Sequence, residues 1–207
     1  MITKKELFFK ELGISLVPHG FLYQKSKNAF SKKEKGAEYV IEFEVWPQFI
    51  QVMPQYFISI KDVEDIKKKA LGNYYQLKST IGTEAFWFDR KAIKSTYWTD
   101  TEENVLKAVA EQASIFTNYG LPFFEKFSSI AMLDQELNKE GSTFDFGIND
   151  FNKCCVSVIA AYLSKNPELK NILARNKEYL KAKERPGVLG ISEYLLLEGY
   201  INDLVRA

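Results

Sequence analysis

The chain has 207 residues, 46% of them apolar and 27% charged, a composition that fits one globular domain or two small ones and excludes disordered and fibrous classes. The 28 Lys and Arg residues are nearly balanced by 27 Asp and Glu residues, so the net charge of +1 creates no global field that would gather nucleic acid or an anionic membrane. The apolar runs fall short of the roughly 20 residues that a membrane-spanning helix needs, and charges interrupt the N-terminal apolar residues before a signal-peptide core can form.

The first predicted element is a short amphipathic helix. Thr3 and Glu6 have the spacing of a capping box, in which each side chain accepts a hydrogen bond from the other residue's backbone N–H. Leu7, Phe8 and Leu12 follow at helical spacing, and Gly13 is the expected stop.

After Pro18 the apolar pattern changes from helical to alternating, which is typical of strands. We expect strands over Phe21–Phe30 and Tyr39–Trp46, joined by the polar stretch Ser31–Gly36 as one long hairpin. The second strand would turn a row of apolar side chains toward the core, namely Tyr39, Ile41, Phe43 and Val45.

Opposite charges favour one register of this hairpin. In that register Lys25 lies opposite Glu44 and Lys27 opposite Glu42, and each such pair contributes about 0.2 to 1 kcal/mol. The same register sets Tyr23 opposite Trp46 and Ala29 opposite Val40.

Two further strands would complete an antiparallel sheet of about four strands. Phe49–Ile60 is the third, and Pro54 within it lacks a backbone donor, which predicts an edge position or a bulge. A short helix over Asp62–Leu71 follows, and Ile93–Thr99 is the fourth strand.

The rest of the chain has helical patterns. Asp100 and Glu103 form a second candidate capping box, opening a helix that ends near Gly120. Further helices are expected over 121–138, 151–163 and 191–205. Another helix should begin with Asn166 as its cap and Pro167 at its first position.

Early strands and late helices predict an α+β fold, in which an N-terminal helix and an antiparallel sheet precede a helical C-terminal half. We expect a mixed sheet-and-helix part over residues 1–140 and a helical part over residues 141–207, sharing one core. The boundary would fall in the polar loop Glu140–Asp150.

The residue types that carry most catalytic chemistry are scarce. His19 is the only histidine, and Cys154 and Cys155 are adjacent, so a zinc site, a disulfide framework and a cysteine nucleophile are all disfavoured. Adjacent reduced thiols also predict a cytoplasmic location. Asp145-Phe146-Gly147 matches the magnesium-binding tripeptide of protein kinases, but the other kinase motifs and any phosphate-binding glycine loop are missing. We therefore predict no cofactor and no metal, and favour a protein that is not an enzyme.

Paired carboxylates leave one enzymatic alternative open. Asp145 and Asp150, or Glu102 and Glu103, could hold magnesium in a hydrolase or nuclease if they converged on one point. Helix N-termini favour acids for simpler electrostatic reasons, which disfavours this alternative.

Charge and aromatic residues point instead to a protein partner. Residues 101–150 contain nine acids and three bases, so an acidic surface could meet a basic partner. Aromatic side chains crowd residues 74–98, where lysines also lie, so single-stranded nucleic acid is a weaker alternative. The predicted partner-binding residues are Trp87, Tyr97, Trp98, Glu102, Glu103 and Glu111.

The chain resembles a bacterial domain-of-unknown-function family in three features: the opening helix closed by Gly13, the Gly20-Phe21 step into a strand with Lys25, and the basic hairpin loop. The resemblance covers about the first 140 residues. It implies an antiparallel sheet after an N-terminal helix, and some members are presumed immunity proteins of bacterial toxins. It implies no catalytic residue.

Overall fold

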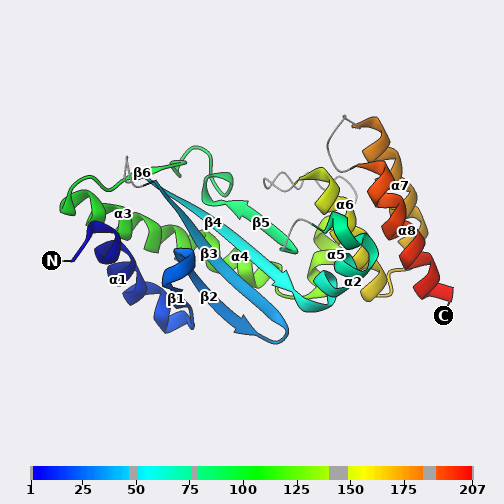
Figure 1. Cartoon of the computed structure of the whole chain (residues 1–207), viewed down its shortest axis with the longest axis horizontal. Helices are drawn as coiled ribbons and strands as arrows, with labels where there is room; N and C mark the ends of the chain where they lie inside the picture. The colour runs from blue at the N-terminus through cyan, green and yellow to red at the C-terminus, as the bar shows by residue number, and fades with distance from the viewer. Residues whose placement is uncertain (1, 47–50, 76–78, 140–148, 184–189, 207) are drawn as a thin grey trace. The chain divides into compact units, whose positions relative to one another are not determined.

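The computed structural model describes residues 2–46, 51–75, 79–139, 149–183 and 190–206. The chain is an α+β protein with an N-terminal helix, an antiparallel sheet and a helical C-terminal half, as predicted (Figure 1). It divides into two compact units: unit 1 comprises residues 1–58 and 82–125, and unit 2 comprises residues 59–81 and 126–207. The loop expected to separate residues 1–140 from 141–207 lies, except for its last two residues, outside the described residues, so that boundary stays a prediction. None of the described helices combines the length and the apolar character needed to cross a membrane.

The described strands form one sheet in the order β1-β2-β3-β4-β5, with β6 paired to β4. The predicted first strand is divided into β1 and β2, and β5 was not predicted. The strands are β1 (Leu22–Gln24), β2 (Ala29–Glu34), β3 (Ala37–Trp46), β4 (Gln51–Ile60), β5 (Ile81–Glu84) and β6 (Tyr97–Trp98).

The predicted register of the hairpin is wrong. Ala29 pairs with Glu42, not with Val40. A 3₁₀ turn (η2, Lys25–Lys27) separates β1 from β2. Asn28 follows this turn with φ of 51°, a left-handed conformation that asparagine adopts more readily than most residues. Lys25 and Lys27 therefore lie outside the ladder and face neither Glu44 nor Glu42.

The β4 strand lies inside the sheet and not at its edge. Its start pairs with β6, since Val52 lies opposite Tyr97. Farther along, Gly82 of β5 lies against Tyr56 and Phe57. Pro54 falls between the stretches of β4 that meet β6 and β5.

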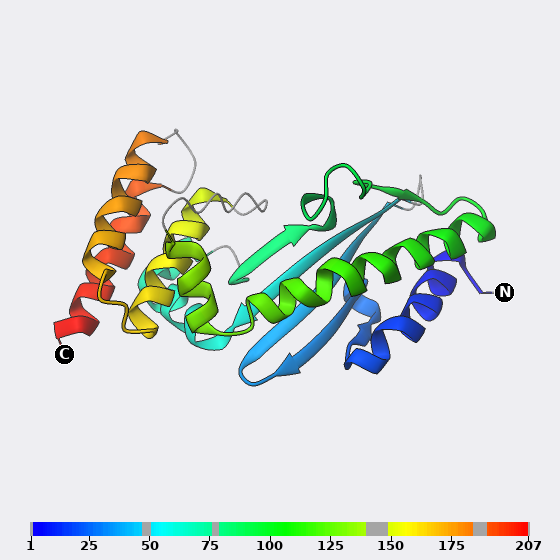
Figure 2. The ribbon, with the colours of Figure 1, turned by 180° about the vertical axis from the view of Figure 1, so that it is seen from behind.

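Helices of unit 1 pack on one face of the sheet. Helix α1 (Lys4–Leu16) begins with the predicted capping box of Thr3 and Glu6, but it continues through Gly13. Helix α3 (Glu102–Ile115) is capped by Thr101 and not by Asp100, and a π-helical turn (η5, Phe116–Gly120) leads from it into α4 (Leu121–Lys126). Figure 2 shows α3 running across the sheet, on the side where it also contacts α1.

Alternation along β3 separates the two faces of the sheet. Tyr39, Ile41 and Phe43 are buried as predicted, whereas Val45 is half-buried. The Phe43 ring lies 5.4 Å from the ring of Phe8 in α1, and Tyr39 lies 5.4 Å from Phe124 in α4. The opposite face of β3 presents the exposed Glu42 and Glu44.

The described part of unit 2 is mainly helical, and its central helix α6 contacts the four other helices described there. Ten residues of α6 are buried. The predicted helix over 121–138 is broken, because Ser129 caps a new helix. The helix predicted to begin after Asn166 starts at Leu169 instead, and Asn166 accepts a hydrogen bond from the Glu168 N–H in the turn before it. The helices are α2 (Lys61–Leu71), α5 (Ile130–Asn138), α6 (Asp150–Leu163), α7 (Leu169–Ala182) and α8 (Ile191–Arg206), and short 3₁₀ turns occur at Val17–His19 (η1), Gly72–Tyr74 (η3) and Ala85–Trp87 (η4).

Candidate partner-binding site

Strand β6 exposes one of the aromatic residues singled out in the sequence and buries the other. Because successive side chains of a strand point to opposite faces, Tyr97 points inward and is 5% exposed, whereas Trp98 points outward and is 54% exposed. Tyr97 is held in place by pairing with Val52 of β4. Trp98 is thus an exposed apolar ring on a backbone that the sheet fixes.

A pocket of about 310 Å³ lies beside Trp98, between β6 and α3. Asn104, Lys107, Ala108 and Glu111 form its α3 wall at helical spacing, so they share one side of the helix. The rest of the lining comes from the chain before α3, namely Lys94, Thr96, Tyr97, Trp98 and Asp100.

Charges of both signs surround this pocket. Lys94 Nζ lies 3.8 Å from Glu111 Oε2 and 6.0 Å from the centre of the Tyr97 ring. Asp100 accepts a hydrogen bond of 2.7 Å from Asn104 Nδ2, which is the main reason that the pKa of Asp100 is below its usual value. The pocket thus combines the Asp100 carboxylate with the exposed Trp98 indole, a combination suited to recognising another protein's surface.

The structure brings together Tyr97, Trp98 and Glu111, three of the six predicted partner-binding residues. Glu102 and Glu103 are exposed in the first turn of α3, where the helix dipole favours acids, and they do not line the pocket. Trp87 lies in η4, half-buried, with the Arg90 guanidinium 3.7 Å from the centre of its ring. Their role in binding a partner stays a prediction.

The groups considered for catalysis have structural partners. His19 is exposed in η1, and its ring packs edge-on against Phe116 at 5.3 Å. Cys154 and Cys155 are free, buried thiols, and burial raises the pKa of both, that of Cys154 to about 12.

The carboxylates considered as magnesium ligands are not gathered at one site in the part of the chain that the structure describes. Asp150 accepts hydrogen bonds from Tyr179 (2.7 Å) and Lys183 (3.0 Å). Among described residues, no three His, Cys, Asp or Glu side chains form a group that could hold a metal ion. Asp145 lies outside the described residues, as does the rest of the Asp145-Phe146-Gly147 tripeptide.

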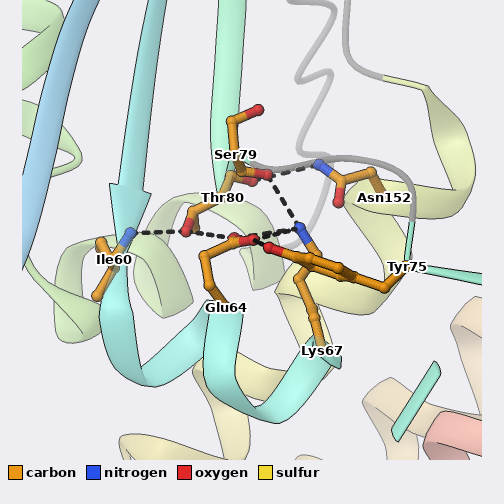
Figure 3. A network of polar contacts seen from close by, with 7 residues as sticks. All are labelled: Ile60, Glu64, Lys67, Tyr75, Ser79, Thr80 and Asn152. Carbon is orange, nitrogen blue, oxygen red and sulfur yellow. Dashed lines mark hydrogen bonds and ion pairs between the residues drawn. The ribbon is translucent and has the colours of Figure 1, made fainter. Parts of the chain in front are cut away.

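Unit 2 contains a buried ion pair that the sequence analysis missed (Figure 3). Lys67 is 1% exposed, and its Nζ lies 3.1 Å from Glu64 Oε1 and 2.9 Å from the Ser79 carbonyl oxygen. The hydroxyls of Tyr75 and Thr80 donate to the same Glu64 carboxylate at 2.7 and 2.8 Å. The signal for it was available, because Lys67 occupies the apolar stripe of α2 between Val63 and Leu71.

This network links several segments of unit 2. The Ile60 N–H donates to Thr80 Oγ1 at 2.8 Å, and Asn152 of α6 donates to the Thr80 carbonyl at 3.3 Å. Burial lowers the pKa of Lys67, and the Glu64 carboxylate opposes that shift. Because the hydrogen bonds of this network join side chains and backbone of one unit, we interpret the network as structural.

Comparison with known proteins gives no relative: no protein-family model, no curated protein and no solved structure matches the chain.

Proposed function

We propose that this chain is a non-enzymatic protein-binding domain that acts by contact with a partner, and that Trp98 anchors the contact. The observation that carries the proposal is the 54% exposure of Trp98 at the edge of the 310 Å³ pocket. Tryptophan is enriched among the residues whose truncation weakens protein–protein binding most, and such anchors fill pockets and are surrounded by polar residues.

The charges near Trp98 favour a basic partner. Asp100 and Glu111 line the pocket, and Glu102 and Glu103 are exposed one turn away on α3. These four acids outnumber three bases, namely Lys94 and Lys107 of the lining and Lys4, which donates to the Asp100 carbonyl. An acidic majority around an apolar anchor steers a positively charged surface toward it and disfavours an acidic one.

An inhibitor that occludes its partner, as presumed immunity proteins do, is the specific form that we propose. A protein of this kind needs a stable scaffold and a contact surface, and it needs no reacting group. The cytoplasm is the compartment that we propose, because both cysteines are free thiols.

Affinity capture from the native host with three immobilised proteins tests the proposal. The wild type and a Tyr74→Ala variant should retain the same protein, whereas Trp98→Ala should lose it. Tyr74 is a matched control, since it is an aromatic residue of unit 2 with 46% exposure. Equal retention by all three proteins, or retention of no protein by the wild type, would contradict the proposal.

A further inference from the structure

The sheet of unit 1 has a second face that the described helices of this unit do not cover. These helices pack on the other face, as Figure 2 shows, and Figure 1 views the sheet from the uncovered side. Along β4, Tyr56 and Ile58 are buried toward the helices, whereas Phe57 between them is half-buried. We call the side of the sheet that carries Phe57 of β4 and Glu42 and Glu44 of β3 the open face.

Two aromatic rings provide the apolar surface of the open face. The Phe57 ring lies across Gly82 of β5, where a Cβ would collide with the ring. Trp98 is on the same side of the sheet, because its neighbour Tyr97 points to the helices together with the paired Val52. A half-buried ring and an exposed ring thus share the open face.

Three glutamates of the open face lack a counter-ion. Glu42 and Glu44 are exposed, and Glu84 of β5, two positions beyond Gly82, is half-buried. None of these three side chains forms an ion pair or a hydrogen bond within the described part of the chain. Glu42 lies opposite the apolar Ala29, and Glu44 is about 6.6 Å farther along the same face of β3. The like charges therefore repel each other, and a cation from outside would relieve that repulsion.

Few bases offset these glutamates. Lys33 of β2 pairs with Glu38 of β3 at 3.8 Å, so this pair adds no net charge to the open face. In the turn η2 before β2, Lys25 pairs with Glu6, and Lys27 is the remaining base. Even with Lys27 included, unpaired acids outnumber unpaired bases here by three to one among the described residues. The open face is therefore acidic and complementary to a basic surface.

We propose that the open face binds a basic surface of a protein partner, with its lysines and arginines beside Glu42, Glu44 and Glu84 and its apolar side chains on the two aromatic rings. This inference rests on the proposed function, because it extends the contact of the same basic partner from Trp98 across the sheet. Charge disfavours the other occupants: nucleic acid carries phosphates, and a second copy of the chain paired face to face would set these glutamates against one another. A small molecule fits less well, since ligand sites are concave and enclose most of their ligand.

Fluorescence anisotropy with the purified full chain and a labelled peptide that alternates arginine and tyrosine tests the proposal. A control peptide has glutamate in place of arginine. The basic peptide should bind the wild type, and added salt should weaken this binding because it screens exposed charges. The acidic peptide should bind at least about tenfold more weakly. No binding of the basic peptide, or equal binding of the two peptides, would overturn the proposal.

Protein variants locate the binding. The double variant Glu42→Lys with Glu44→Lys should weaken binding of the basic peptide at least about tenfold, because it sets like charges against each other. Glu178→Lys with Asp203→Lys is the matched control, since it makes the same change of net charge at two exposed acids of α7 and α8. The control should bind like the wild type. Equal weakening by both double variants would show attraction to net charge alone and would overturn the proposal.

Two further variants separate this inference from misfolding and from the function proposed above. The milder pair Glu42→Gln with Glu44→Gln should also weaken binding, by a smaller factor, while its circular dichroism spectrum stays that of the wild type. If Trp98→Ala loses the basic peptide and the lysine variant of β3 does not, the Trp98 contact stands and the open face is ruled out. The reverse result would support the open face and contradict Trp98 as the anchor.

Discussion

The ammonium group of Lys67 and the carboxylate of Glu64 form an ion pair of 3.1 Å inside unit 2, where the lysine side chain is 2% exposed. Each charge has further partners, since Lys67 donates to the Ser79 carbonyl and Glu64 accepts from Tyr75 and Thr80. A buried pair of this kind adds little to stability as a whole but leaves an uncompensated charge when one member is removed.

Lys67→Met should therefore lower the free energy of unfolding by about 3 to 5 kcal/mol. Urea unfolding followed by far-ultraviolet circular dichroism measures it. The double variant Lys67→Met with Glu64→Gln should recover part of the loss, because it removes the orphaned carboxylate. A single variant as stable as the wild type would contradict the structural interpretation of the network.

Gly120 supports the close approach of η5 to the sheet. A Cβ at this position would lie 2.5 Å from Cε1 of Tyr56, a ring that is 1% exposed. Gly120→Ala should lower the free energy of unfolding by about 1 to 3 kcal/mol through overpacking. Gly199 in α8 is the matched control, since a Cβ there meets no atom within 4 Å. Gly199→Ala should raise stability by about 1 kcal/mol, and the same sign of change for both variants would contradict this explanation.

The hydrogen bonds that link Asp150 of α6 to Tyr179 and Lys183 should make the stability of the protein depend on pH. Burial raises the pKa of the Asp150 carboxyl, but the hydrogen bonds from Tyr179 and Lys183 and the charge of Lys183 outweigh it, so the pKa is below its usual value. A lowered folded-state pKa contributes stability at pH values above the unfolded-state pKa, and this contribution is lost as the pH falls through the folded-state pKa.

The stability advantage of the wild type over Asp150→Asn should therefore be constant above about pH 4 and shrink at lower pH. Urea titrations at a series of pH values measure the difference between the two proteins. A difference that stays unchanged down to about pH 2 would show that the carboxylate is not held by these partners.

Cys154 and Cys155 should behave as buried apolar groups. Because burial raises the pKa of both thiols, neither is ionised to a useful extent at about pH 8. Ellman's reagent should react slowly with the native protein. After unfolding in urea, it should react readily with both thiols. Rapid native reaction of either thiol would instead indicate an accessible, activated cysteine.

Local signals predicted the structure correctly where residues close to one another in the sequence decide it. Thr3 and Glu6 cap α1 as expected, because a capping box involves residues three positions apart. The alternation of Tyr39, Ile41 and Phe43 likewise predicted the buried face of β3, and the exposed Trp98 was singled out by the aromatic pattern.

Tertiary contacts decided the features that the sequence did not predict. The register of the hairpin depends on the turn at Asn28, which lets Lys25 reach Glu6 and not Glu44. The aromatic cluster of Phe9, Tyr23 and Phe30 joins rings that are separate in the sequence. Patterns among neighbouring residues do not show which residues from distant parts of the sequence pack together.

The most direct test of the protein-binding function is the dissociation constant of the captured partner, measured by titration calorimetry with the wild type, Trp98→Ala and Tyr74→Ala. Trp98→Ala should weaken binding at least about tenfold, as expected for an anchor residue. Tyr74→Ala should bind like the wild type, because Tyr74 belongs to unit 2 and does not line the pocket. Unchanged binding by Trp98→Ala would contradict the account.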